Sequence, residues 1–118
     1  MPRPSSALAV LALIGVLAAP ALAGGTGEEA PQFSEEFLND ADVLAKGQEI
    51  WVEQCQICHG KNAYPGKAPR LKPRKYTPEF VYKRVTKGFK GMPAWDEVYN
   101  QEERMSVTAW VKNKDFSN

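Results

Sequence analysis

Apolar side chains recur at helical spacing in three stretches of this chain, and no stretch alternates as a half-buried strand would. The first stretch begins near Asn39 or Asp40, whose side chains can accept from free amide groups, and it runs to the pair of cysteines. Gly47 costs about 1 kcal/mol inside a helix relative to alanine, so we interpret it as a point where another helix crosses. The predicted inner face carries Val43, Gly47, Ile50, Trp51 and Gln54.

The second predicted helix opens at Thr77-Pro78-Glu79. Thr77 is a good N-cap, proline is tolerated in the first turn, and a glutamate there interacts well with the helix dipole. Gly88 supplies a stop signal. The predicted buried side consists of Phe80, Val81 and Val85.

The third predicted helix opens at Asn100, with Glu103 placed for a capping box. Its predicted inner face consists of Met105, Val107, Trp110 and Val111. We expect Trp110 to pack near Gly47 and Trp51. The fold class predicted from these patterns is all-α, with three main helices.

A long irregular loop separates the first two helices. Glycines and prolines rule out regular structure between Cys58 and Thr77; they are Gly60, Pro65, Gly66, Pro69 and Pro73. A compact domain rarely keeps so long a loop without a surface for it to pack on. We therefore expect this loop to cover a bound group.

The amino-terminal segment has the pattern of an export signal. Arg3 precedes the apolar stretch 7–19, and Pro20-Ala21-Leu22-Ala23 provides a small-residue cleavage site. The stretch is shorter than the roughly 20 residues of a membrane span. We predict a cleaved signal peptide at 1–23, a flexible polar leader at 24–38, one domain at 39–118, and a periplasmic location without membrane insertion of the mature domain.

Charge is nearly balanced overall, with a formal net charge of +1, but it is segregated along the chain. Residues 24–58 carry eight acidic side chains and only Lys46 as a base, whereas residues 59–91 carry ten basic side chains and only Glu79 as an acid. The basic segment is either a set of solvated lysines or a positive surface that steers an acidic protein partner. A nearly neutral exported domain does not favour nucleic acid as a partner.

The sequence Cys55-Gln56-Ile57-Cys58-His59 is the attachment motif of a c-type haem. Two thiols on one helical turn can each bond to a haem vinyl group, and the adjacent imidazole is placed to ligate the iron. One such motif predicts one covalently attached haem c per chain.

The motif has four other possible interpretations. A disulfide would close a very small loop and leave His59 unexplained. A thioredoxin-like dithiol needs a βαβ setting, and a zinc ion would lack a fourth cysteine or histidine, because the chain has two cysteines and one histidine. Unmodified buried cysteines are the remaining alternative.

A sixth iron ligand can be sought among the methionines. Met92 lies in the glycine- and proline-flanked loop Gly91-Met92-Pro93, which can present a thioether, whereas Met105 sits at a core spacing and is interpreted as a gap filler. The carbonyl of Pro69 or its neighbour can accept from the outer ring nitrogen of His59. The alternative is that Pro69 is only a turn residue.

These motifs make the chain resemble a small single-haem class I cytochrome c of bacteria. The resemblance rests on Gly47-x-x-x-Trp51, the Cys55–His59 motif, Ala68-Pro69-Arg70-Leu71, Gly91-Met92-Pro93-Ala94-Trp95 and the Trp110 helix. It implies helices and loops wrapped around one haem, with Cys55 and Cys58 as thioether sites. It also implies His59 as the proximal ligand and Met92 as the distal ligand.

The function implied is that of a periplasmic single-electron carrier between a donor such as a dehydrogenase and a reductase or oxidase. It would not be an enzyme by itself. One alternative is a haem peroxidase or gas-sensing domain with an open sixth iron position. Another is a thiol redox or metal-binding module without haem.

Overall fold

The computed structural model describes residue 15 and residues 29–116. The predicted signal peptide and the first part of the predicted leader therefore lie outside the described residues, apart from Gly15. Within the described part the regular elements are all helical, and the one β-type pairing is an isolated bridge between Phe89 and Met92. None of the helices in this part has the length and hydropathy needed to cross a lipid bilayer.

The first predicted helix is confirmed, but it has three parts. Helix α2 (Ala41–Ile50) continues into a π-helical turn, η1 (Trp51–Cys55), and then into α3 (Gln56–His59). The Asp40 carboxylate caps its start by accepting from the backbone N–H groups of Asp42 and Val43 at 2.9 and 3.0 Å. The π turn was not predicted, and such single turns are frequent at functional sites.

A short helix, α1 (Glu35–Asn39), begins inside the segment 24–38 that was predicted to be a flexible leader. Ser34 caps it by accepting from the backbone N–H of Phe37 at 3.1 Å. The ring of Phe33, just before it, lies edge-on to the rings of Phe37 and Tyr82, with centroids 6.2 and 6.0 Å apart. The chain is thus attached to the domain several residues earlier than the sequence indicated.

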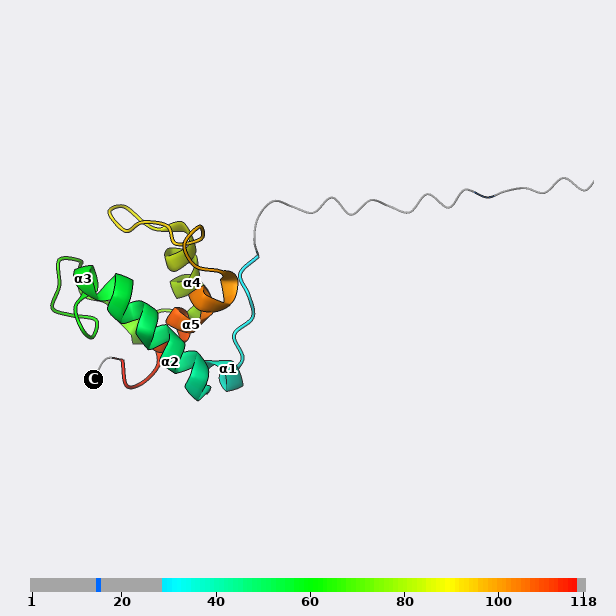
Figure 1. The fold of residues 1–118 in the computed structure, drawn as a ribbon, viewed down its shortest axis with the longest axis horizontal. Coiled ribbons are helices and arrows are strands. Elements are labelled where there is room, and N and C mark those ends of the chain that lie inside the picture. The colour runs from blue at the N-terminus through cyan, green and yellow to red at the C-terminus, as the bar shows by residue number, and fades with distance from the viewer. Residues whose placement is uncertain (1–14, 16–28, 117–118) are drawn as a thin grey trace, which may run out of the picture.

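Helix α5 (Gln101–Lys112) crosses α2 at Gly47, as predicted (Figure 1). A Cβ atom at Gly47 would lie 2.8 Å from the Cβ of Trp110 and would overlap the carbonyl of Ser106. The two helix backbones are therefore in near contact, and only glycine fits. The apolar core beside this crossing consists of Ile50, Trp51, Ala63, Val81, Val85, Val107, Val111 and Phe116, which we call the core cluster.

The start of α5 is the predicted capping box, since Asn100 and Glu103 each accept from the other's backbone N–H at 2.9 Å. Its inner face is more polar than predicted. Arg104 and Thr108 are buried, whereas Met105 is only half-buried. Arg104 donates to the hydroxyl of Thr86 at 2.8 Å, and Thr108 donates to the carbonyl of Arg104 at 2.8 Å, so both polar groups are satisfied within the protein.

Helix α4 (Pro78–Lys87) begins at Thr77 and ends at Gly88, which has a φ of +70°, as predicted. The prediction that Phe80 is buried is wrong, because its side chain is 41 % exposed. Its ring packs instead against Tyr76, with ring centroids 5.2 Å apart, and the Cζ atom of the Arg84 guanidinium lies 4.9 Å from its centroid. The side packed into the domain consists of Val81, Tyr82, Val85 and Thr86.

The loop after α3 is anchored to the protein at both ends. Ala63 is buried in the core cluster, and its carbonyl accepts from the backbone N–H of Leu71 at 3.2 Å. A short 3-10 helix, η2 (Pro73–Lys75), follows. Lys112 of α5 donates to the carbonyls of Pro73, at 2.6 Å, and Tyr76, so the segment before α4 is fixed to the last helix.

We predict that Gly47→Ala lowers the free energy of unfolding of the haem-loaded protein by about 1–3 kcal/mol, as expected for overpacking. This loss should outweigh the gain in helix propensity of about 1 kcal/mol. Guanidinium or thermal unfolding measures it. Gln48→Ala, at an exposed position of the same helix, is the control and should change stability by less than about 0.5 kcal/mol. Equal effects of the two variants would contradict a close helix crossing.

Candidate functional site

The two cysteines lie at the end of the first long helix. Cys55 closes the π turn and is half-buried against the core cluster, while Cys58 is exposed in α3. No disulfide joins them. Burial raises the pKa of Cys55 to about 12, and the charge of Cys58 acts in the same direction. At this pKa Cys55 is almost entirely protonated at pH 7, so it is a poor thiolate nucleophile.

His59 is the last residue of α3, and Gly60, with a φ of +81°, turns the chain away from the helix axis. Burial lowers the pKa of His59, so its imidazole is neutral at pH 7, the form that ligates metals. Its Nδ1 atom is buried without a hydrogen-bond partner. A buried polar atom left unsatisfied costs about 1–3 kcal/mol, so Nδ1 needs a hydrogen-bond partner.

Trp51 connects the π turn with the backbone after His59. Its indole Nε1–H donates to the carbonyls of Gly60 and Lys61 at 3.2 and 2.9 Å. Its ring centroid is 5.7 Å from that of His59. The helical periodicity places Trp51 in the core and gives no sign of this polar contact, although a buried indole N–H generally requires an acceptor.

Met92 lies in a tight turn after α4. The backbone groups of Phe89 and Met92 bond to each other in both directions, at 3.0 and 2.9 Å, and Lys90 adopts a φ of +52° within the turn. Two residues after Pro93, the N–H of Trp95 donates to the carbonyl of Val85 at 3.1 Å. The loop that carries the thioether is therefore held at both ends.

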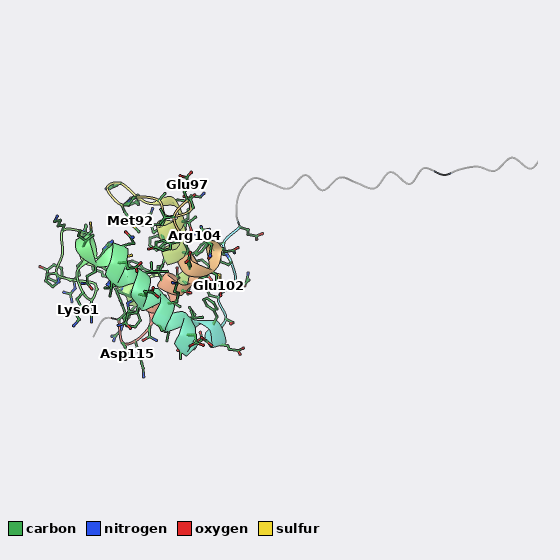
Figure 2. All side chains as sticks on the ribbon, in the orientation of Figure 1. Lys61, Met92, Glu97, Glu102, Arg104 and Asp115 are labelled. Atoms are coloured by element: carbon green, nitrogen blue, oxygen red, sulfur yellow. The ribbon has the colours of Figure 1, made fainter. Side chains whose placement is uncertain are left out.

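The predicted attachment segment and the predicted distal-ligand segment both border the core cluster. Cys55 and Met92 both pack against the core cluster, from α2–α3 and from the loop after α4 respectively. Figure 2 shows Met92 beside the loop after α4. Leu71 and Tyr76 of the intervening segment pack against the same cluster.

Pro69 is exposed, and the predicted hydrogen bond from His59 to its carbonyl is not formed, since Nδ1 has no partner. The preceding residue is nonetheless close to the motif, because the N–H of Ala68 donates to the carbonyl of Cys58 at 2.8 Å. Gly66 is also close, since a Cβ atom there would overlap that same carbonyl. The loop thus returns to the cysteine motif just before Pro69.

Residue 15 and residues 29–116 contain no group of three or more histidine, cysteine, aspartate or glutamate side chains able to hold a metal ion. This part of the chain includes both cysteines and the one histidine, so the geometry gives no support to a zinc site.

The comparisons with known proteins decide the family. The family model described as "Cytochrome C oxidase, cbb3-type, subunit III" matches residues 42–111, more than half of the 118-residue chain. The chain belongs to this family of cytochrome c domains. It accordingly binds haem c covalently.

Three solved structures are similar to this cytochrome. A c-type cytochrome NirC has a TM-score of 0.54 and 21 % identity, over 67 % of this chain and 99 % of its own. The KustC0563 c-type cytochrome has a TM-score of 0.54 and 19 % identity, over 61 % and 98 %. Cytochrome CL from the marine methylotrophic bacterium Methylophaga aminisulfidivorans has a TM-score of 0.57 and 21 % identity, over 76 % and 70 %. A search of curated proteins gives no significant match.

At these identities the similarity concerns the fold, and it confirms the predicted all-α class I cytochrome c fold. The side chains present also fit the cofactor. Two thiols are available for thioether bonds, the adjacent imidazole of His59 is in the neutral form that ligates metals, and a thioether packs on the same cluster as Cys55.

We predict that wild-type protein matured in a haem-attaching periplasm has the mass of the mature polypeptide plus one haem. Replacing both cysteines, Cys55→Ser with Cys58→Ser, should abolish covalent haem, because no other thiol is available. Either single replacement should retain one thioether bond. Mass spectrometry and haem staining of denaturing gels measure the outcome, and haem that stays bound to the double variant under denaturing conditions would contradict it.

Proposed function

We propose that this cytochrome is a single-electron carrier whose haem is attached through Cys55 and Cys58 and ligated by His59 and Met92. The observation that carries the proposal is the position of Met92. Its loop is fixed at both ends, and its side chain packs on the core cluster that Cys55 also contacts. A thioether placed in this way can serve as a permanent ligand.

The bound haem supplies one-electron chemistry by alternating between Fe(III) and Fe(II). The thioether of Met92 is a soft donor and favours the reduced state relative to a second histidine. The apolar surroundings of Cys55 and Met92 act in the same direction, because they solvate the extra positive charge of the oxidised state poorly. Both ligand-bearing segments are fixed by backbone hydrogen bonds, so little rearrangement needs to accompany electron transfer.

The carbonyl of Pro69 is part of this proposal as the acceptor for His59 Nδ1. The hydrogen bond between Ala68 and Cys58 keeps the loop beside the motif, and His59 Nδ1 needs a partner. A hydrogen bond from Nδ1 to such a carbonyl fixes the tautomer and ring plane of a ligating histidine and increases its basicity.

We predict that Met92→Ala abolishes the sulfur-to-iron charge-transfer band of the oxidised protein. The reduction potential should fall by a sizeable part of the range of about 0.8 V that axial ligands span. Absorption spectroscopy and a redox titration measure these changes. Met105→Leu, at a half-buried position of α5, is the control and should change neither the band nor the potential.

Ligation by Met92 would be contradicted if the oxidised wild-type protein had a high-spin spectrum and bound cyanide at once. That result would favour a haem peroxidase or gas-sensing domain with an open sixth position.

We further propose that the carrier acts in the periplasm and exchanges electrons with a redox protein that has an acidic docking surface. The basic side chains of residues 59–91 are exposed, except for the half-buried Arg84. Among the described residues the ion pairs are Lys46–Glu49 and Lys87–Asp96, so nearly all of the basic segment is free to interact with a partner's carboxylates.

We predict that the rate of electron exchange with an acidic partner falls about tenfold or more between low and high ionic strength, the lower end of the range for electrostatic steering. Charge reversal at Lys67, Lys72 or Lys90 should slow association and leave the reduction potential nearly unchanged. Lys46→Glu, on α2 outside the basic segment, is the matched control. Stopped-flow kinetics measure the rates, and rates that do not depend on salt would contradict steering.

A further inference from the structure

Trp51 is almost fully buried, at 3 % exposed. Its ring fills part of the core, and its indole N–H donates to backbone carbonyls. The two carbonyls that it binds belong to Gly60 and Lys61, the first and second residues after His59. Trp51 is also the first residue of the π turn that leads into Cys55. One side chain thus joins the segment before the cysteine motif to the segment after it.

These two carbonyls lie where the backbone leaves the helix. The N–H of Gly60 still bonds to the carbonyl of Gln56 at 2.8 Å, but the positive φ of Gly60 then turns the chain sharply. Carbonyls just beyond such a turn have no helical partner of their own. The indole N–H satisfies both of them and fixes the direction in which the chain continues from His59.

Trp51 is itself held from the opposite side. The ring of Phe116 lies edge-on to the Trp51 indole, with centroids 4.6 Å apart and an interplanar angle of 85°. Phe116 is fully buried, and its backbone N–H donates to the carbonyl of Asn113 at 3.1 Å. The segment after α5 therefore folds back over Trp51 and restrains the indole against His59, whose ring centroid is 5.7 Å from that of Trp51.

We propose that Trp51 is a positioning residue for the proximal ligand: its indole N–H fixes the backbone of Gly60 and Lys61 and thereby sets the orientation of the His59 imidazole at the iron. This inference rests on ligation of the iron by His59, as proposed above. Groups that orient a ligating histidine influence the electronic properties of the metal. Trp51 therefore adjusts the reduction potential through the orientation of His59, without ligating the iron itself.

Trp51→Phe is the test, because it keeps an aromatic ring and removes both hydrogen bonds. Trp110→Phe is the matched control. The Trp110 indole also lies beside Phe116, with centroids 6.1 Å apart, but its buried N–H has no acceptor. Both variants lose similar ring volume, so both should lower the melting temperature. Only Trp51→Phe should shift the midpoint potential and the hyperfine-shifted NMR signals of the His59 ring protons in the oxidised holoprotein.

Equal shifts of potential in the two variants, or unchanged His59 signals in a destabilised Trp51→Phe protein, would overturn the role of Trp51. Should Trp51→Phe fail to mature with haem, Phe116→Leu replaces it. That variant loosens the indole and should shift the His59 signals and the potential, and a loss of stability without these shifts would overturn the proposal. Absence of hyperfine-shifted His59 signals in the wild-type protein would instead overturn the ligation on which the inference rests.

Discussion

The close crossing of α2 and α5 at Gly47 is the constraint on which the rest of this cytochrome depends. Because no Cβ atom separates the two backbones at that point, the residues that follow Gly47 by one turn are pressed against the last helix and the segment after it. Trp51 is one of these residues, and it reaches from there to the backbone after His59. The position of the cysteine motif is thus set by a helix contact made eight or more residues earlier in the chain.

The distal side is organised by separate interactions. The turn that contains Met92 is closed by its own backbone hydrogen bonds and is attached to α4 through Trp95 and Val85. Helix α4 is joined to α5 by the buried hydrogen bond between Arg104 and Thr86. Both proposed ligands are therefore positioned relative to α5. His59 is connected to it through α2, and Met92 is connected to it through α4. This arrangement suits a carrier, because neither ligand segment needs to move when one electron is gained or lost.

Features set by a few neighbouring residues were predictable from the sequence. Local capping residues predict where the helices begin, at Asp40, Thr77 and Asn100. The end of α4 at Gly88 follows from the backbone freedom of glycine. The attachment motif is likewise local, since its chemistry depends on two thiols and an imidazole at fixed spacing. Gly47 was interpretable because its cost in a helix requires a compensating contact.

Apart from the crossing at Gly47, features set by packing between distant segments were not predictable. The periodicity of α4 gives no sign that Phe80 lies outside the core. Its side chain contacts the ring of Tyr76 and the guanidinium of Arg84 instead of core residues. Burial of Arg104 depends on an acceptor eighteen residues away in the sequence, Thr86. The π turn at 51–55 and the partner of the Trp51 indole depend on where the loop after His59 runs, which no local signal specifies.

X-ray absorption at the iron edge of the holoprotein tests the central claim most directly, because it identifies the ligand atoms in both oxidation states. The proposed carrier requires one sulfur ligand and one imidazole nitrogen ligand in addition to the porphyrin nitrogens, in the oxidised and in the reduced protein alike. A spectrum without sulfur ligation, or a change of ligand set on reduction, would contradict it.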